Sequence, residues 1–187
     1  MVKRGDIESV VSEYLLEGTE KETKHEWTLE NAPGSNGVKL LKASIHSPQA
    51  MDGPPFIMEN ELHLEFTFNS EMGNSTRLDI TFHLMDEMGN LVFVGSTART
   101  AQENIVARGI FNATCIIPGD LMNEGTYYIS RLLIIKNKGS VLYEHRDLLN
   151  FKIVRPSGEK LGWQGKKEGI VRPKLAWKID IEEKKPV

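Results

Sequence analysis

Residues 60–70, NELHLEFTFNS, alternate between polar and apolar side chains from position 61 to position 69. Successive side chains of a β-strand point to opposite faces, so this alternation predicts a strand that is buried on one face only. The apolar face carries leucine and phenylalanine, which would pack into a core. The other face would meet water and carries His63, Glu65 and Thr67.

The same period recurs in residues 77–86, RLDITFHLMD, where the outward positions are Asp79, Thr81 and His83. Further segments rich in β-branched and aromatic residues follow, separated by Gly, Pro, Asn, Asp and Ser. Seven strands without intervening helices predict an all-β chain folded as an antiparallel β-sandwich. The predicted strands span residues 38–47, 60–70, 77–86, 90–97, 109–118, 126–137 and 142–154.

The chain begins differently. Apolar residues recur at helical spacing within residues 5–18, with Asp6 placed to cap the start of a helix and Gly18 to end it. A charged and then turn-rich stretch follows. We therefore expect a short N-terminal helix and linker over residues 1–26, and one folded domain over residues 27–187.

Composition limits the classes of function. A chain of 187 residues with 40% hydrophobic residues can bury a core, and a net charge of −3 gives no long-range attraction for nucleic acid. The single cysteine, Cys115, lies in an apolar run and cannot form an internal disulfide. No apolar run has the length of a membrane span or of a secretory signal. These features favour a soluble, cytoplasmic protein.

Residues 115–130, CIIPGDLMNEGTYYIS, contain the most sharply defined loop. Pro118 cannot donate to a ladder and Gly119 tolerates unusual backbone angles, so the strand should end there. If Tyr127 and Ile129 face the core, the outward side chains of the next strand are Tyr128, Ser130 and Leu132. Arg131 is then either buried with a partner or, on the wet face, able to bind an anion.

Four stretches of the sequence together resemble one family: GNLVF at 89–93, IPGDLMNEGTYYIS at 117–130, LNFKIV at 149–154 and GIVRPKLAWKIDI at 169–181. Taken together, they look like the C-terminal domain of Wzt-type ATP-binding proteins, which belong to ABC transporters that export O-antigen polysaccharide in Gram-negative bacteria. The N-terminal helix also resembles the segment that closes the nucleotide-binding domain of such ATPases.

The resemblance implies an immunoglobulin-like sandwich that binds the non-reducing end of the finished polysaccharide and couples its completion to export. It also implies a homodimer, possible exchange of a C-terminal strand within residues 165–187, and a transmembrane partner subunit at the inner membrane. The sequence contains no GxxxxGK[ST] motif, so we expect no ATP hydrolysis by this chain.

Carbohydrate recognition requires planar polar groups for hydroxyls and an aromatic ring for an apolar sugar face. If the predicted strands share a sheet, their outward side chains would form one polar patch able to hold a glycan. We expect no cofactor. The candidate residues for this carbohydrate-binding patch are His63, Glu65, Thr67, Asp79, Thr81, His83, Tyr128, Ser130 and Arg131.

The sequence supports other classes of function less well. A glycosidase would need two carboxylates across a cleft, for which Glu61, Glu65 and Asp79 are the available residues, but no spacing marks a catalytic pair. No serine lies in a G-x-S-x-G elbow, and the five histidines are too scattered to predict a metal site. A domain that only dimerises or docks onto other export components is the remaining alternative.

Overall fold

A computed structural model of the chain describes residues 23–50, 53–73, 76–99, 108–156 and 169–172. The helix expected near residues 6–18 lies outside these ranges, as does most of the C-terminal segment 165–187. Within the described ranges we find no helical segment with the length and apolarity that crossing a bilayer requires.

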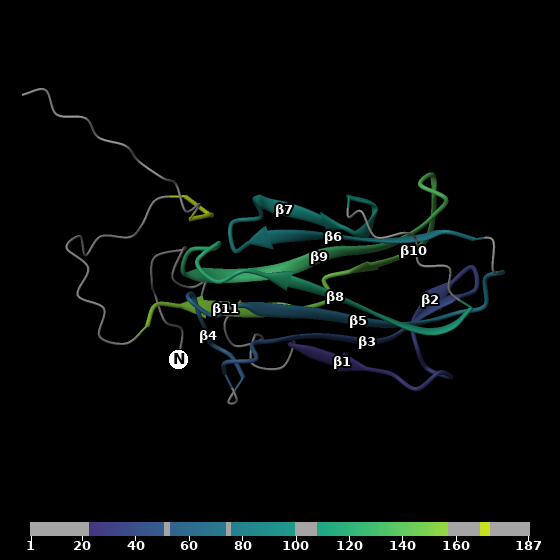
Figure 1. The fold of residues 1–187 in the computed structure, drawn as a ribbon, viewed down its shortest axis with the longest axis horizontal. Coiled ribbons are helices and arrows are strands. Elements are labelled where there is room, and N and C mark those ends of the chain that lie inside the picture. The colour runs from purple at the N-terminus through teal and green to yellow at the C-terminus, as the bar shows by residue number, and fades with distance from the viewer. Residues whose placement is uncertain (1–22, 51–52, 74–75, 100–107, 157–168, 173–187) are drawn as a thin grey trace, which may run out of the picture.

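The described chain forms two β-sheets whose strands run along the long axis of the molecule (Figure 1). The first sheet has the order β1-β3-β5-β8, with β2 also paired to β3. All of its pairings are antiparallel. Its strands are β1 (Lys24–Glu26), β2 (Gly34–Ser35), β3 (Val38–His46), β5 (Leu62–Ser70) and β8 (Gly109–Ile117).

The second sheet has the order β4-β11-β9-β6-β7, and β10 pairs with β9 beside β11. Only the short β4–β11 pairing is parallel. A 3₁₀ turn, η2 (Thr97–Arg99), follows β7. The strands of this sheet are β4 (Phe56–Ile57), β6 (Leu78–Asp86), β7 (Leu91–Ser96), β9 (Gly125–Lys136), β10 (Ser140–Arg146) and β11 (Asn150–Val154).

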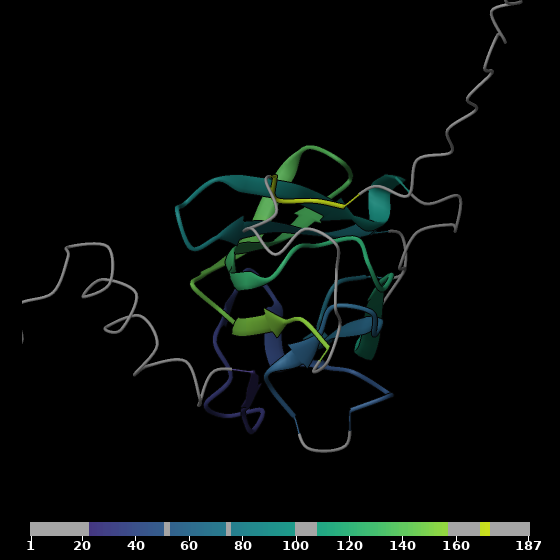
Figure 2. The ribbon, with the colours of Figure 1, turned by 90° about the vertical axis from the view of Figure 1, so that its left-hand side faces the viewer.

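The two sheets lie in separate layers, as the view from the end of the strands shows (Figure 2). The alternating strands place their apolar sides between the layers, where phenylalanine rings meet from both sheets. The ring centroids of Phe66 on β5 and Phe82 on β6 are 6.1 Å apart. The most deeply buried large side chains include Phe56, Phe66, Phe68, Phe151, Leu84 and Ile129. The predicted β-sandwich is therefore confirmed.

The observed strands differ from the predicted ones in several details, and the short strands β2 and β4 were not predicted. The segment predicted as one strand over residues 142–154 is two strands, because the chain turns at Asp147, whose φ is 49°. Both pieces pair with β9, β10 along its C-terminal half and β11 along its N-terminal half. The sheet also begins at Lys24, three residues before Trp27, where a linker was expected.

An aromatic cluster joins the two sheets at one edge of the sandwich. Trp27 stacks on His25 with ring centroids 5.4 Å apart, and its centroid lies 6.0 Å from that of His145 on β10. His145 Nδ1 and the Tyr143 hydroxyl are 2.7 Å apart. Trp27 packs against the core. His145 is half-buried, because Tyr143 and His145 take the inward side of β10.

This cluster predicts a loss of stability in mild acid. Burial, and secondly the nearby His25, lower the pKa of His145. The unfolded chain takes up this proton near the ordinary histidine pKa of about 6.5, whereas the folded chain resists it. Stability present above that pH should therefore fall as the pH drops through and below it. Melting temperatures at pH 7.5 and 5.5 should differ less in His145→Gln than in the wild type; an unchanged difference would contradict this role for His145.

Candidate functional site

The predicted site residues lie on both sheets. β5 belongs to the first sheet, whereas β6 and β9 pair with each other in the second. Each strand turns its polar side away from the core, so the outer faces of the two sheets point to opposite sides of the sandwich. The expectation of one shared patch is therefore wrong. His63, Glu65 and Thr67 form one group, and Asp79, Thr81, His83, Tyr128, Ser130 and Arg131 belong to the other.

On the first sheet, the predicted polar groups are bonded to one another. Glu65 accepts a hydrogen bond from Lys42 Nζ at 3.0 Å and one from Ser44 Oγ at 3.4 Å. The bond from Lys42 is the main reason why the pKa of Glu65 is lowered. His63 Nε2 lies 3.0 Å from a Glu61 oxygen. Thr67 Oγ1 donates to Asn112 Oδ1 at 2.6 Å. These contacts leave few polar groups free for a ligand.

Two of the predicted residues on β6 are more buried than expected. Thr81 pairs its hydroxyl with that of Ser96 on β7 at 2.9 Å, which satisfies both groups. Asp79 is only 5% exposed, and its Oδ2 atom has no hydrogen-bond partner within the described chain. Both residues are thus poorly placed to meet a large ligand, although they lie on the outer side of their strand.

The centre of β9 contains a β-bulge that changes which side chains face out. His83 pairs with Arg131 and the next residue, Leu84, pairs with Ile129, so Ser130 is the extra residue. Beyond the bulge the alternation is shifted by one. Leu132 is fully buried, contrary to the prediction, whereas Tyr127 and Ile129 face the core as predicted. Arg131 lies on the wet face.

Arg131 is held by a carboxylate on the neighbouring strand. Its Nε donates to Glu144 Oε1 at 3.0 Å and its Nη2 to Glu144 Oε2 at 3.2 Å, which is the bidentate geometry of strong guanidinium–carboxylate pairs. Arg146 Nε donates to the same Oε1 atom at 2.9 Å. These contacts, with the bond from Arg131 first, lower the pKa of Glu144, and Glu144 raises the pKa of Arg131.

An aromatic ring completes this surface. Tyr128 lies between Met85 on β6 and Asn150 on β11 in the strand register. No described residue forms a hydrogen bond with the Tyr128 hydroxyl or the His83 ring, and the buried Asn150 Oδ1 also lacks a described partner. We call this surface the β9 face; it comprises His83, Tyr128, Arg131, Glu144, Arg146 and Asn150.

Half of the β9 face is absent from the predicted site residues. Glu144 and Arg146 lie within the predicted strand 142–154, but only strand pairing shows that they lie beside Arg131. Asn150 follows the turn at Asp147, in a stretch predicted to continue the preceding strand. The period-two spacing of Glu144 and Arg146 was the one signal in the sequence that placed them on a common face.

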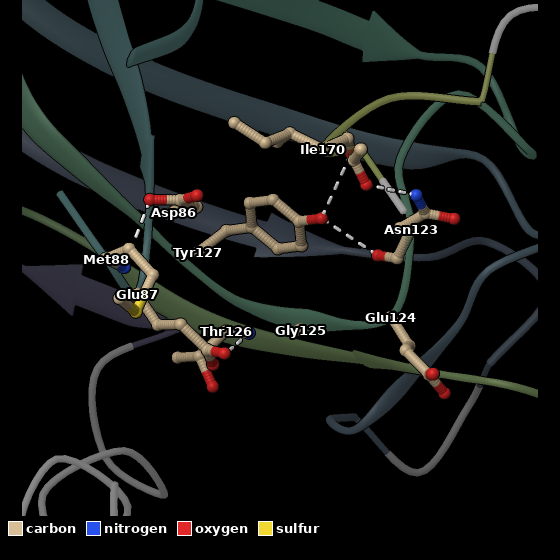
Figure 3. Close-up of a pocket in the computed structure, with 10 residues that line it drawn as sticks. Asp86, Glu87, Met88, Asn123, Glu124, Gly125, Thr126, Tyr127 and Ile170 are labelled. Carbon is tan, nitrogen blue, oxygen red and sulfur yellow. Dashed lines mark hydrogen bonds between the residues drawn. The ribbon is translucent and has the colours of Figure 1, made fainter. Parts of the chain in front are cut away.

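A cavity of 530 Å³ lies at one end of the sandwich, where the turn after β6 meets the start of β9 (Figure 3). Its volume would suit a small ligand. Three carboxylates line it, but each is already bonded. Asp86 accepts from the Met88 and Asn90 backbones, Glu87 from the Thr126 backbone, and Glu124 from Arg155.

Tyr127 is one of the residues that line this cavity. Its hydroxyl donates to the Asn123 carbonyl oxygen at 2.9 Å (Figure 3). Burial, followed by the charges of Asp86 and Glu87, raises the pKa of Tyr127 to about 12, so the hydroxyl stays protonated. Segment 169–172 lies alongside, with Asn123 donating to the Gly169 carbonyl oxygen. Through these hydrogen bonds, this end of the sandwich connects β9 and the loop before it with segment 169–172.

The described residues contain no cluster of three or more side chains suited to holding a metal ion. Cys115 is half-buried on β8, and burial raises the pKa of its thiol. Among the surfaces described, the β9 face alone combines an aromatic ring, paired charges and polar atoms without a described partner. It is therefore our candidate site.

No family model matches the sequence, and no curated protein matches it. Solved structures do match in fold. One, the "Crystal structure of the C-terminal domain of wzt", aligns with a TM-score of 0.61 and 18% identity over 86% of this chain and 90% of that chain. Another, the "X-ray structure of Northeast Structural Genomics Consortium target SoR45", covers 72% of this chain and 98% of that chain at 12% identity, but its TM-score of 0.35 is too low to compare folds. The chain thus has a fold like that of the C-terminal domain of wzt.

Proposed function

We propose that the chain is a carbohydrate-binding domain of an ABC exporter that handles O-antigen, and that it binds the non-reducing end of the finished polysaccharide. The sequence motifs that resemble Wzt-type proteins support this role, and so does the fold similarity to the C-terminal domain of wzt. In this role the chain does not itself catalyse a reaction. It recognises the completed polymer, and the ATPase and transmembrane parts of the transporter carry out the export.

The observation that carries the proposal is the composition of the β9 face. A sugar presents hydroxyls around its rim and C–H groups on its faces, so its site needs both fixed polar groups and a flat ring. Tyr128 provides the ring. Arg131 and Glu144 hold each other in place and provide the fixed polar groups.

The first sheet is a poorer site because its polar groups are already paired. A ligand there would have to replace the bonds of Glu65 to Lys42 and Ser44, with little net gain. We further propose that the protein acts as a homodimer. Two sites per molecule would raise the apparent affinity for a polymer above that of a single weak site.

Tyr128→Ala should weaken binding of the full chain to the O-antigen polysaccharide of its source bacterium by about tenfold, because a stacked ring contributes roughly 0.5–1.5 kcal/mol beyond its buried area. Titration calorimetry measures this, with dextran as an unrelated neutral polymer. Wild-type protein should bind the O-antigen and not dextran.

Glu65→Gln is the matched control, since it removes a charge from the outer face of the other sheet. It should leave polysaccharide affinity unchanged. Equal losses in Tyr128→Ala and Glu65→Gln would move the site away from the β9 face. No binding of the O-antigen by the wild type at high protein concentration would contradict the proposed function and favour a scaffold that only dimerises or docks.

A further inference from the structure

Strand β8 forms one edge of the first sheet and lacks the features that usually protect a free edge. It pairs with β5 along all nine of its residues without a bulge, and no described strand pairs with its other side. Its sequence, GIFNATCII, contains no charged residue and no proline. A regular, uncharged edge strand of this length offers unpaired N–H and C=O groups to a further strand.

The other edges of the two sheets carry such protection. β1 has only three residues, of which Lys24 and Glu26 are charged. β4 has two residues and directly follows Pro54-Pro55. β7 and β10 are each interrupted by a β-bulge. Short length, charge, proline and bulges all hinder pairing with another chain. Among the described edge strands, β8 alone has none of them.

The side chains of β8 leave apolar surface exposed on both faces of the strand. On the outer face Ile110 is 69% exposed and Ile116 is 57% exposed. On the inner face Phe111, Ala113 and Cys115 pack against the core but are only half-buried. Adjoining apolar surface of this kind is typical of an interaction site.

The inner face of β8 also borders an opening toward the core. A cleft of 280 Å³ lies between β8 and strands β6 and β7 of the other sheet. Phe66 and Phe82 line it together with Cys115. A partner that covers β8 would therefore remove from water both the side chains of the strand and part of this apolar cleft.

Two copies of β8 are complementary to each other in an antiparallel pair about Ala113. Because Ala113 is the middle residue of the strand, this register is the one that pairs all nine residues. On the outer face it places Ile110 opposite Ile116. On the inner face it places Phe111 opposite Cys115, beside the cleft. Each pair occurs twice by symmetry, and apolar cross-strand pairs stabilise a sheet.

We infer that the protein forms a two-fold symmetric dimer through β8–β8 pairing, which joins the first sheets of two copies into one continuous sheet. The inference rests on the homodimer of the proposed function and names its surface. A contact between two identical edges closes on itself, so it gives a dimer and not a fibre. Antiparallel neighbours keep their outer faces on the same side of a sheet. Both β9 faces then lie on one side of the dimer, as the avidity of the proposed function requires.

Disulfide cross-linking of the full chain tests the register. In a Cys115→Ala background, Ala113→Cys places each new thiol opposite its copy, at a Cα separation of about 4.5–5.5 Å that suits a disulfide. Ile110→Cys is the matched control, since position 110 is more exposed but lies opposite 116, which puts its two copies about 20 Å apart. Under mild oxidation, Ala113→Cys should form a disulfide dimer at least about tenfold faster than Ile110→Cys.

A charge on the edge should separate the two copies. Ile116→Lys places an ammonium group opposite the apolar Ile110 side chain of the second copy. Sedimentation equilibrium should therefore show a dissociation constant of the dimer at least about tenfold higher than that of the wild type. Val141→Lys on β10 is the control, because Val141 is similarly exposed at 54%, and it should leave the constant unchanged. Equal circular dichroism of the two variants would show that the fold is intact.

The outcomes separate this inference from the proposed function. A dimer in which Ala113→Cys cross-links no faster than Ile110→Cys would overturn the β8 interface and indicate another surface, such as an exchanged segment 165–187. A monomer at every concentration would overturn both the interface and the homodimer, but not binding of the O-antigen by a single β9 face. Fast cross-linking of Ala113→Cys without any O-antigen binding would support the interface and contradict the carbohydrate-binding role.

Discussion

Phe66→Ala is expected to lower the free energy of unfolding by about 3–5 kcal/mol, the range for removing a large aromatic side chain from a packed core. Phe66 is only 2% exposed. Its ring centroid lies 6.4 Å from that of Phe68 on the same strand and 6.1 Å from that of Phe82 on the other sheet. Alanine would leave a cavity at the contact between the two sheets, and neither strand can move to fill it without breaking its ladder.

The neighbouring position supplies the control. Thr67 points to the opposite face of β5 and loses only its bond to Asn112 when it is replaced by alanine. Thr67→Ala should therefore cost about 0.5–1.5 kcal/mol. Urea unfolding of both variants measures the two values with the same method. Similar costs for Phe66→Ala and Thr67→Ala would mean that the alternation of β5 does not divide core from solvent.

The sequence was sufficient to predict the long strands because each obeys one local rule. β5 buries alternate residues along its length, as the spacing of its leucines and phenylalanines predicted. β1, β2 and β4 have two or three residues each, too few to show a period. They form because a neighbouring strand offers free backbone groups, which is a property of the tertiary structure and not of the segment itself.

The site was harder to predict than the fold. Alternation shows which side chains of a strand face water, but it does not show which sheet the strand joins. β5 and β6 follow each other in the chain and have the same pattern, yet they lie in opposite layers. His63 and His83 are therefore both outward, as predicted, but on different sides of the molecule. No local feature of either strand indicates which of the two sheets it joins.

The bulge at Ser130 accounts for the remaining error. A strict period of two placed Leu132 outside and left Arg131 undecided. One extra residue opposite His83 reverses that assignment for the rest of β9. The observed register is favourable because it buries the apolar Leu132 in the core and lets Arg131 donate to Glu144. A bulge could have been suspected from the run of apolar residues after Arg131, but its position depends on the pairing with β6.

Gly119→Ala should lower the melting temperature by about 6–12 °C, on the basis of roughly 3 kcal/mol for overpacking and 2–4 °C per kcal/mol in a chain of this size. A Cβ atom at Gly119 would lie 2.7 Å from the Glu59 carbonyl carbon and closer still to its oxygen. The Glu59 backbone cannot rotate away from this clash as a flexible side chain could. A hydrogen bond next to Gly119 also holds the two segments together, because Asp120 N donates to the Met58 carbonyl oxygen at 2.7 Å.

Gly73→Ala is the matched control, because a Cβ atom there would meet nothing within 4 Å and the backbone does not adopt a positive φ. That variant should melt at or slightly above the wild-type temperature, as alanine reduces the entropy of the unfolded chain. Calorimetry of the two variants tests the difference. If Gly119→Ala melted like Gly73→Ala, the loop would not approach Glu59 closely, and β9 would lose the fixed starting point from which it presents Tyr128 and Arg131.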